Sequence, residues 1–355
     1  MALPRKPSEY RKDPLSNSWV IISAERNGRP EEFREVATHR VGAPCPFCAG
    51  NERETPAAIA SYPNASKASP AWQVRVVPNK YPAVMPMEAP SCQATQSSFN
   101  TAPPSLFTSV CGHGQHEVII ESPTHAISLT DLSPEIVDTT FLAYRDRIRF
   151  FREAGDWSYV QVFKNVGAAA GSSIEHAHSQ VVAMPVVPAR VAEEVAHTAA
   201  YWKTHKRLLF ADLVEQELSA GERMVSETAE FVAFCPFASR FPFETWIVPR
   251  KPMAQFETSA DSLVRQLAQF TQSVVRRLEL VLNRTAYNYL IHTAPFDSSS
   301  AAHYQWHIEL FPRLTKFAGF EWGTGYSINP VSPEQAAEIL RQAAIEMKSP
   351  IEKSS

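Results

Sequence analysis

The sequence has little excess charge of either sign, because its 355 residues carry a formal net charge of −3. It therefore lacks the basic field that attracts nucleic acid, and no nucleic-acid partner is predicted. No apolar run reaches the length of a membrane span, and the polar segment from Met1 to Lys12 has no signal-peptide core. These absences predict a cytoplasmic protein that has no membrane partner.

Cysteine is also scarce, with five residues, two of which form the motif Cys45-Pro46-Phe47-Cys48. In a reducing compartment this spacing favours a metal site or a redox pair over a structural disulfide. Both thiolates can reach one tetrahedral ion, which then requires two more ligands. His125 and His176 are the candidates, because each lies at the end of a predicted strand. A zinc site is the first interpretation, and a redox pair or an unliganded pair stays open.

The length of the chain suggests two domains or one large duplicated unit. Both halves show the same order: a strand, a long helix, a strand, a loop, and a histidine-bearing strand that ends in proline. We interpret this as a tandem duplication of one α+β unit, with antiparallel sheets covered by helices. The predicted units are residues 1–225 and 226–355. Helices are expected over residues 133–154, 188–213, 259–282 and 332–347.

The segment Asn165 to Gln180 connects two predicted strands and contains Gly167, Gly171 and several alanines. Small residues let the backbone approach a ligand and expose its N–H groups. His176 and His178 follow at the start of the second strand, where alternation directs both side chains to one face. A small-residue loop that leads into two imidazoles on one face indicates chemistry on a phosphate.

His178 is the sharper candidate, because an imidazole can attack phosphorus and leave again through a covalent phosphoramidate. The alternative is a half-buried strand histidine bonded to a carbonyl, but His176 and the adjoining loop favour the functional interpretation. Ser173, Gln180 and the loop amides could hold the phosphate oxygens, and Asn165 a ribose or backbone group. A separate loop carries Arg26 and Arg29, for which nucleotide contact and a solvated turn both stay open.

The second half has its own histidines, His292 and His307, and Glu309 alternates with His307 so that both share a face. Together with Glu194 they could form a second metal site with nitrogen and oxygen ligands. The alternative is a hydrogen-bonded structural cluster. We predict that His292, His307 and Glu309 lie close together in space, whether or not a metal binds there.

Four segments together resemble one known family over the span from about Arg11 to about Arg341. They are Cys45–Cys48, Asn165–Gln180, the run Phe241-Pro242-Phe243-Glu244-Thr245-Trp246, and the run Lys316-Phe317-Ala318-Gly319-Phe320-Glu321. The chain resembles the galactose-1-phosphate uridylyltransferases, within the histidine-triad superfamily. This resemblance implies an α+β fold of tandem histidine-triad-like units and a ping-pong nucleotidyltransferase of galactose metabolism. It also implies a homodimer that uses UDP-glucose and galactose 1-phosphate.

The resemblance also implies roles for individual residues. His178 corresponds to the nucleophile that carries the nucleotidyl group. The ligands of a structural Zn²⁺ would be Cys45, Cys48, His125 and His176. Nucleotide and phosphate contacts would come from Arg26, Arg29, Asn79, Asn165, Ser173 and Gln180, and hexose contacts from Lys316, Phe317 and Glu321.

The chain departs from the family pattern at several positions. The motif reads His176-Ala177-His178-Ser179-Gln180, with alanine and serine where the family has proline and glycine. Glu309 replaces a third histidine of the second metal site, and the segment 321–330 also differs. These features are similar to the neighbouring branch of ADP-glucose phosphorylases, which implies ADP-glucose and phosphate as alternative substrates. A rival of another class is a catalytically silent nucleotide-binding sensor, against which the intact His178 argues.

Overall fold

The computed structural model describes residues 7–23, 45–64, 70–86, 106–107, 110–296 and 302–346. The predicted nucleotide contacts of Arg26 and Arg29 lie outside these ranges. Within the described ranges, no helix is long and apolar enough to cross a membrane.

A single ten-stranded antiparallel sheet forms the centre of the molecule, with the strand order β3-β4-β5-β7-β6-β11-β12-β10-β9-β8. Its strands are β3 (Ala60–Pro63), β4 (Trp72–Pro78), β5 (Gln115–Ile120), β6 (Tyr159–Val166), β7 (His178–Met184), β8 (Met224–Glu227), β9 (Phe231–Phe234), β10 (Thr245–Pro249), β11 (Tyr287–His292) and β12 (His307–Pro312). A separate small sheet pairs β1 (Glu9–Lys12) with β2 (Trp19–Ile22), and β2 in parallel with β13 (Ser327–Asn329).

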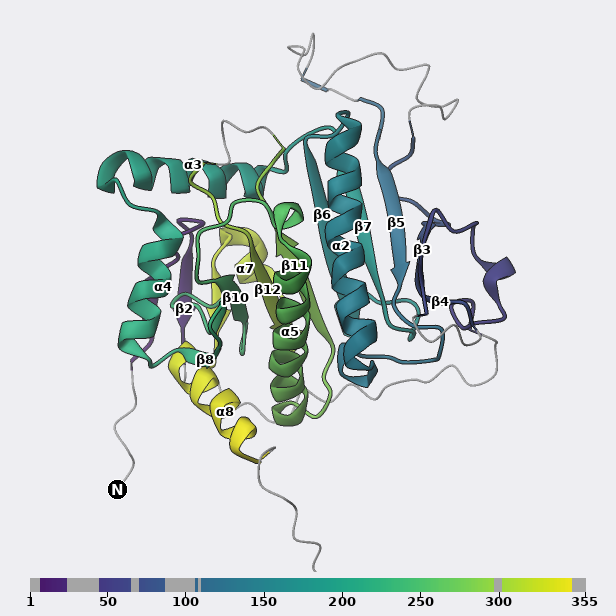
Figure 1. Cartoon of the computed structure of the whole chain (residues 1–355). Coiled ribbons are helices and arrows are strands. Elements are labelled where there is room, and N and C mark those ends of the chain that lie inside the picture. Colours follow the sequence, from purple (N-terminus) through teal and green to yellow (C-terminus); the bar gives the residue numbers. More distant parts are fainter. Residues whose placement is uncertain are drawn as a thin grey trace, which may run out of the picture.

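Helices flank the sheet (Figure 1). They are α2 (Pro134–Ala154), α3 (Ala189–His205), α4 (Leu209–Ala220), α5 (Asp261–Val281), the short α7 (Gly319–Thr324) and α8 (Pro333–Glu346). Helix α2 begins with proline after Ser133 and ends at Gly155, which is left-handed with φ 79°. The single helical stretch predicted over 188–213 is instead two helices, because Lys206 adopts φ 55° and ends α3.

The predicted duplication is visible in the topology. The order β4, β5, α2, β6, β7 recurs as β9, β10, α5, β11, β12, and the sheet order is symmetrical about the β6–β11 pair. This arrangement confirms the α+β class. The two units do not form separate sheets, because β6 and β11 pair antiparallel, with Val162 opposite Ile291. Pairing these strands removes two edges that would otherwise leave backbone groups unsatisfied.

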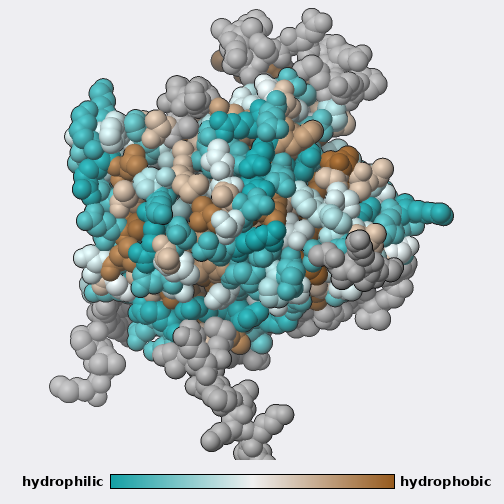
Figure 2. All heavy atoms as spheres, viewed as in Figure 1, coloured by the Kyte–Doolittle hydropathy of each residue, from teal (hydrophilic) through white to brown (hydrophobic). Residues whose placement is uncertain are grey.

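Helices α2 and α5 lie side by side over the same face of the sheet (Figure 1). One core cluster beneath them draws buried side chains from both units, among them Phe141, Val162, Leu267 and Ile291. The outer surface seen over these helices is mainly hydrophilic, with hydrophobic residues scattered across it (Figure 2). Residues of β7 alternate between this helical layer and the opposite face, so His178 and Gln180 lie on the face without α2 and α5.

Candidate functional site

His178 is the first residue of β7 and is 8% exposed. Its Nδ1 lies 2.6 Å from the carbonyl oxygen of His176. A carbonyl can only accept, so Nδ1 carries the proton and donates it, and the neutral ring keeps its lone pair on Nε2. Burial lowers the pKa of His178 below the usual range of an imidazole. The hydrogen bond to the His176 carbonyl therefore orients a neutral imidazole, and its Nε2 lone pair is available to an electrophile.

The four predicted metal ligands come together beside this histidine. Their ligand atoms all lie within 4.8 Å of one another. The Sγ atoms of Cys45 and Cys48 lie 3.4 and 3.6 Å from Nδ1 of His176, and Cys48 Sγ lies 3.6 Å from Nδ1 of His125. Ligands of a tetrahedral Zn²⁺ bound at the usual Zn–S and Zn–N lengths are about 3.5 Å apart. The donors and their spacing therefore fit a closed four-ligand metal site.

His176 links this cluster to His178. Its Nε2 lies 2.9 Å from the carbonyl oxygen of Ser122, so Nε2 is the donor and Nδ1 is left as the ligand atom. The backbone carbonyl of the same residue accepts the Nδ1 proton of His178. Phe47, between the two cysteines, packs edge-on against both imidazoles, with ring centroids 5.9 Å from His176 and 5.3 Å from His178. The metal-ligand cluster and the candidate nucleophile thus form one rigid unit.

Gln180 lies two residues further along β7, on the same face as His178. Its Oε1 is 2.8 Å from Nε2 of His116 and 3.4 Å from Nδ2 of Asn79. Asn79 follows β4, and its backbone N–H donates to the His116 carbonyl. The structure therefore brings Asn79 and Gln180 together and adds His116, which was not among the predicted site residues.

The predicted glycine loop, residues 167–173, approaches this face from β6. Gly167 has φ 83°, and a Cβ built there would lie 2.8 Å from that of Ala286, so only glycine fits. The N–H groups of Ala170, Gly171 and Ser172 donate to carbonyls within the loop. These three amides are therefore not available to a phosphate, contrary to the expectation for the loop as a whole. Ser173 is exposed at the end of the loop.

Asn165 lies at the end of β6, and its Oδ1 accepts a 2.7 Å hydrogen bond from Nδ2 of Asn288 on β11. The same Asn288 amide donates to the carbonyl of Ala170 in the glycine loop. Since its oxygen is occupied, Asn165 has its Nδ2 group left to donate. The sequence could not reveal Asn288, because this residue reaches the first unit only through the β6–β11 pairing.

A buried polar network supports β7 from the helical side. Lys164 donates to Glu121 at 2.5 Å, and both side chains are 0% exposed. Glu121 also accepts hydrogen bonds from Tyr144 at 2.8 Å and from Ser179. The Lys164 ammonium lies 3.3 Å from the carbonyl oxygen of His178. Ser179, which departs from the family motif, therefore connects β7 to this network.

The second unit forms a histidine cluster at the equivalent strand, as predicted. The rings of His292 and His307 stack at 4.8 Å, and His292 lies 3.5 Å from Glu309 and 3.4 Å from Glu194. Glu194, His292 and His307 place ligand atoms close enough for a metal ion. Burial lowers the pKa of His292, but the carboxylates of Glu194 and Glu309 outweigh this and raise it to about 9.

Two arginines distinguish this second cluster from the first. Arg190 contacts both oxygens of Glu309 at 2.7 and 2.9 Å, and Arg240 contacts one of them at 2.8 Å. Both carboxylate oxygens of Glu309 are therefore occupied by ion pairs and are not available as metal ligands. His307 repeats the His178 geometry, with Nδ1 3.2 Å from the Gln305 carbonyl, but it is 0% exposed. Of these two imidazoles, His178 keeps some exposed surface and His307 keeps none.

The predicted hexose segment lies elsewhere on the chain. Phe317 stacks on Phe241 with ring centroids 5.2 Å apart, and Glu321 accepts a hydrogen bond from the N–H of Ala318 at the start of α7. Phe241 precedes β10, and three strands, β6, β11 and β12, separate β10 from β7. At about 4.8 Å per strand, β10 lies roughly 20 Å from β7 across the sheet.

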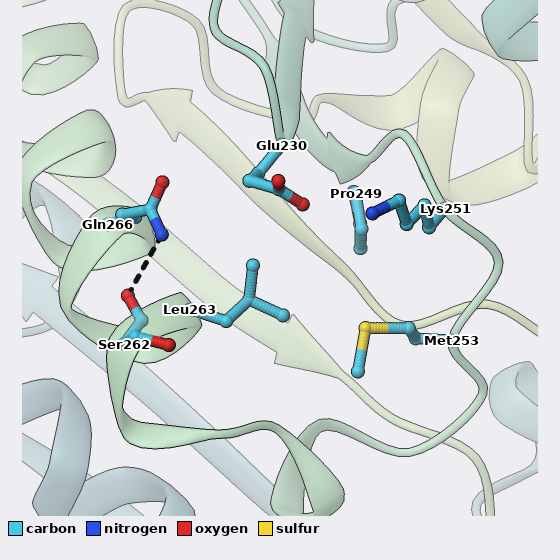
Figure 3. Close-up of a pocket in the computed structure, with 7 residues that line it drawn as sticks. All are labelled: Glu230, Pro249, Lys251, Met253, Ser262, Leu263 and Gln266. Carbon is cyan, nitrogen blue, oxygen red and sulfur yellow. Dashed lines mark hydrogen bonds between the residues drawn. The ribbon is translucent and has the colours of Figure 1, made fainter.

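One surface hollow of about 270 Å³ lies between the end of β10 and the start of α5 (Figure 3). It is lined by Glu230, Pro249, Lys251, Met253, Ser262, Leu263 and Gln266. In Figure 3 the carboxylate of Glu230 and the ammonium of Lys251 flank an apolar floor. None of the predicted site residues lines this hollow, so it has no part in the site around His178.

The fold and the site define a class: a duplicated α+β protein in which a metal-ligand cluster supports an open histidine. A family model for the N-terminal domain of galactose-1-phosphate uridyl transferase matches residues 4–188, and one for a domain of unknown function (DUF4921) matches residues 112–351. The chain belongs to the galactose-1-phosphate uridylyltransferase family. The predicted family and enzyme class are thereby confirmed.

Individual relatives extend over nearly the whole chain. ADP-glucose phosphorylase of Arabidopsis thaliana is 34% identical and covers 95% of this chain and 93% of its own. Galactose-1-phosphate uridylyltransferase of Haemophilus influenzae is 27% identical and covers 95% of both. The crystal structure of the Arabidopsis phosphorylase with bound ADP-glucose has a TM-score of 0.80 at 33% identity, covering 95% of this chain and 99% of that one. A uridylyltransferase structure has a TM-score of 0.71 at 26% identity, covering 96% and 100%.

Proposed function

We propose that the protein transfers a nucleotidyl group from a nucleoside diphosphate hexose to a phosphate-bearing acceptor through a covalent intermediate on His178. The observation that carries this proposal is the Nδ1 hydrogen bond to the His176 carbonyl, which leaves the Nε2 lone pair free. In the first half-reaction Nε2 attacks the α-phosphorus. A P–N bond forms, the P–O bond to the hexose 1-phosphate breaks, and this leaving group departs with the electron pair.

In the second half-reaction an oxygen of the acceptor phosphate attacks the same phosphorus. A P–O bond forms, the P–N bond breaks, and Nε2 regains its lone pair, while the proton stays on Nδ1 and keeps its hydrogen bond to the His176 carbonyl throughout. The amide of Gln180 and the hydroxyl of Ser173 hold the non-bridging oxygens. Asn79, Asn165, Arg26 and Arg29 bind the nucleotide.

We assign Zn²⁺ to the cluster of Cys45, Cys48, His125 and His176, which supplies four donors. A four-ligand site of this kind is closed, so zinc has a structural role and does not meet the substrate. Its contribution is to fix the His176 backbone, whose carbonyl orients His178. In the second cluster, Arg190 and Arg240 occupy the carboxylate of Glu309, which leaves Glu194, His292 and His307 as the residues that could hold an ion.

The relatives support two candidate sets of substrates. Uridylyltransferases over nearly the full chain support UDP-glucose as donor and galactose 1-phosphate as acceptor, in galactose metabolism. A second candidate is phosphorolysis of ADP-glucose, with phosphate as acceptor. It is favoured by the higher identity of 34% and the TM-score of 0.80 with the Arabidopsis phosphorylase. The two candidates share the chemistry at His178.

We further propose a cytoplasmic homodimer. The thiols of Cys45 and Cys48 are free, which leaves both available as metal ligands. We place the hexose role of Lys316, Phe317 and Glu321 at the site of a second copy, because Phe317 packs on Phe241 before β10, and β10 lies roughly 20 Å across the sheet from β7. The exposed Phe320 and Trp322 on α7 would be covered in such a dimer.

The test uses UDP-glucose and ADP-glucose, each labelled either at the α-phosphate or in the glucose. Protein is incubated with one donor, denatured and separated from small molecules. The α-phosphate label is expected to stay on the protein, and the glucose label is not. Release of the label by galactose 1-phosphate or by phosphate then identifies the acceptor. Protein that takes up label from neither donor would be the silent sensor instead.

A further inference from the structure

Gln180 can assist phosphate transfer only in one of its two amide orientations. Its NH₂ group donates to a phosphate oxygen, whereas its Oε1 would repel one. The terminal amide torsion has no strong intrinsic preference, so a neighbour must distinguish oxygen from nitrogen. The orientation of the Gln180 amide therefore depends on a neighbouring residue.

The position of the proton on His116 fixes this orientation. The backbone N–H of Ala83 donates to Nδ1 of His116 at 3.1 Å. A backbone N–H cannot accept, so Nδ1 carries the lone pair and the proton of the neutral ring is on Nε2. Burial lowers the pKa of His116, which keeps the ring neutral. Nε2 lies 2.8 Å from Gln180 and must donate to it, so the atom there is Oε1.

Asn79 supports the same orientation. Its Oδ1 accepts from the N–H of Tyr81 at 2.8 Å, which leaves Nδ2 directed to Gln180 Oε1 at 3.4 Å. The donors of Asn79 and His116 lie 3.1 Å apart because both converge on this oxygen. Among the described residues, none accepts a hydrogen bond from Nε2 of Gln180, so its two protons remain for a ligand.

We propose that His116 is a positioning residue for nucleotidyl transfer, which orients the Gln180 amide so that its NH₂ group donates to the phosphate held at His178. This inference rests on the proposed function. The register supports it, because His116 on β5 pairs with Val182 on β7 and Val118 pairs with Gln180, so His116 is diagonal to Gln180 on the same face.

The experiment is a double-mutant cycle on the rate at which α-phosphate-labelled donor labels the protein. His116→Phe keeps an aromatic ring but removes the donor, and it should slow labelling by about 10- to 100-fold, the usual range for a lost supporting hydrogen bond. His116→Gln restores an N–H at the position of Nε2 and should recover most of the rate. In a Gln180→Ala background, His116→Phe should have no further effect.

His113→Phe is the matched control, because His113 lies just before the same strand but packs against Trp157, with the two rings tilted and their centroids 4.9 Å apart. It should label at the wild-type rate. If His116→Phe slows labelling equally in the wild-type and the Gln180→Ala backgrounds, the inference is wrong, because His116 then affects the rate independently of Gln180. Unfolding curves of each variant show whether it is folded. If wild-type protein takes up no label, the proposed function fails and the inference fails with it.

Discussion

Lys164→Met tests whether the buried ion pair beneath β7 stabilises the protein. Lys164 and Glu121 are both 0% exposed and 2.5 Å apart. Methionine fills most of the volume of the lysine stem but leaves the Glu121 carboxylate without its cation. Removing one partner of a buried pair costs about 3–5 kcal/mol. The hydroxyls of Tyr144 and Ser179 still donate to Glu121, so we expect about 3 kcal/mol.

Urea unfolding, followed by tryptophan fluorescence and circular dichroism, measures this loss. The free energy of unfolding of a domain is only about 5–15 kcal/mol. The urea concentration at the midpoint should therefore fall clearly, while the m-value stays unchanged. The double variant Lys164→Met/Glu121→Gln has no uncompensated charge and should return to within about 1–2 kcal/mol of wild type. Arg265→Met is the control, because Arg265 is half exposed and forms a 3.5 Å ion pair with Asp138 at the surface. Loss of this pair should change the free energy of unfolding by about 0.5 kcal/mol or less.

The reasoning is refuted if Lys164→Met costs less than about 1 kcal/mol, or if the double variant is no more stable than the single one. Lys164 also donates to the carbonyl of His178 at 3.3 Å. The same variant should therefore slow nucleotidyl transfer even under conditions in which it is fully folded.

Two further predictions concern the metal and the glycine loop. Cys48→Ser should lose about one equivalent of zinc per chain and slow labelling of His178. Cys235→Ser should keep its metal, because Cys235 belongs to neither candidate ligand group. Equal zinc in the two variants would contradict the zinc assignment. Gly167→Ala should lower the free energy of unfolding by at least about 1 kcal/mol more than Gly155→Ala. Both glycines have positive φ, but only at Gly167 would a methyl group meet another atom, and equal losses would contradict this.

Local signals in the sequence predicted the elements that depend on local chemistry. Helix α2 follows from Ser133-Pro134 at one end and Gly155 at the other. The four-residue metal cluster follows from the C-x-x-C spacing and the ligand number of zinc. The side-by-side placement of His292 and His307 follows from the duplication, and the structure confirms it at 4.8 Å.

Features that depend on contacts between distant segments could not be predicted. The pairing of β6 with β11 joins the units into one sheet, and no local pattern specifies which edges meet. Arg190 and Arg240 reach Glu309 from different elements, which turns a candidate ligand into an ion-pair partner. The role of His116 depends on a tautomer fixed by the N–H of Ala83, which only the folded hairpin brings close.

Isotope exchange tests the central claim most directly. Labelled glucose 1-phosphate and unlabelled nucleoside diphosphate glucose are mixed with protein in the absence of any second acceptor. Wild-type protein should move label into the donor, because the His178 intermediate forms and reverses. His178→Gly should lose this exchange by roughly 10⁴-fold or more while remaining folded, and His205→Ala, at an exposed helix end, should keep it. Near-normal exchange by folded His178→Gly would contradict the account.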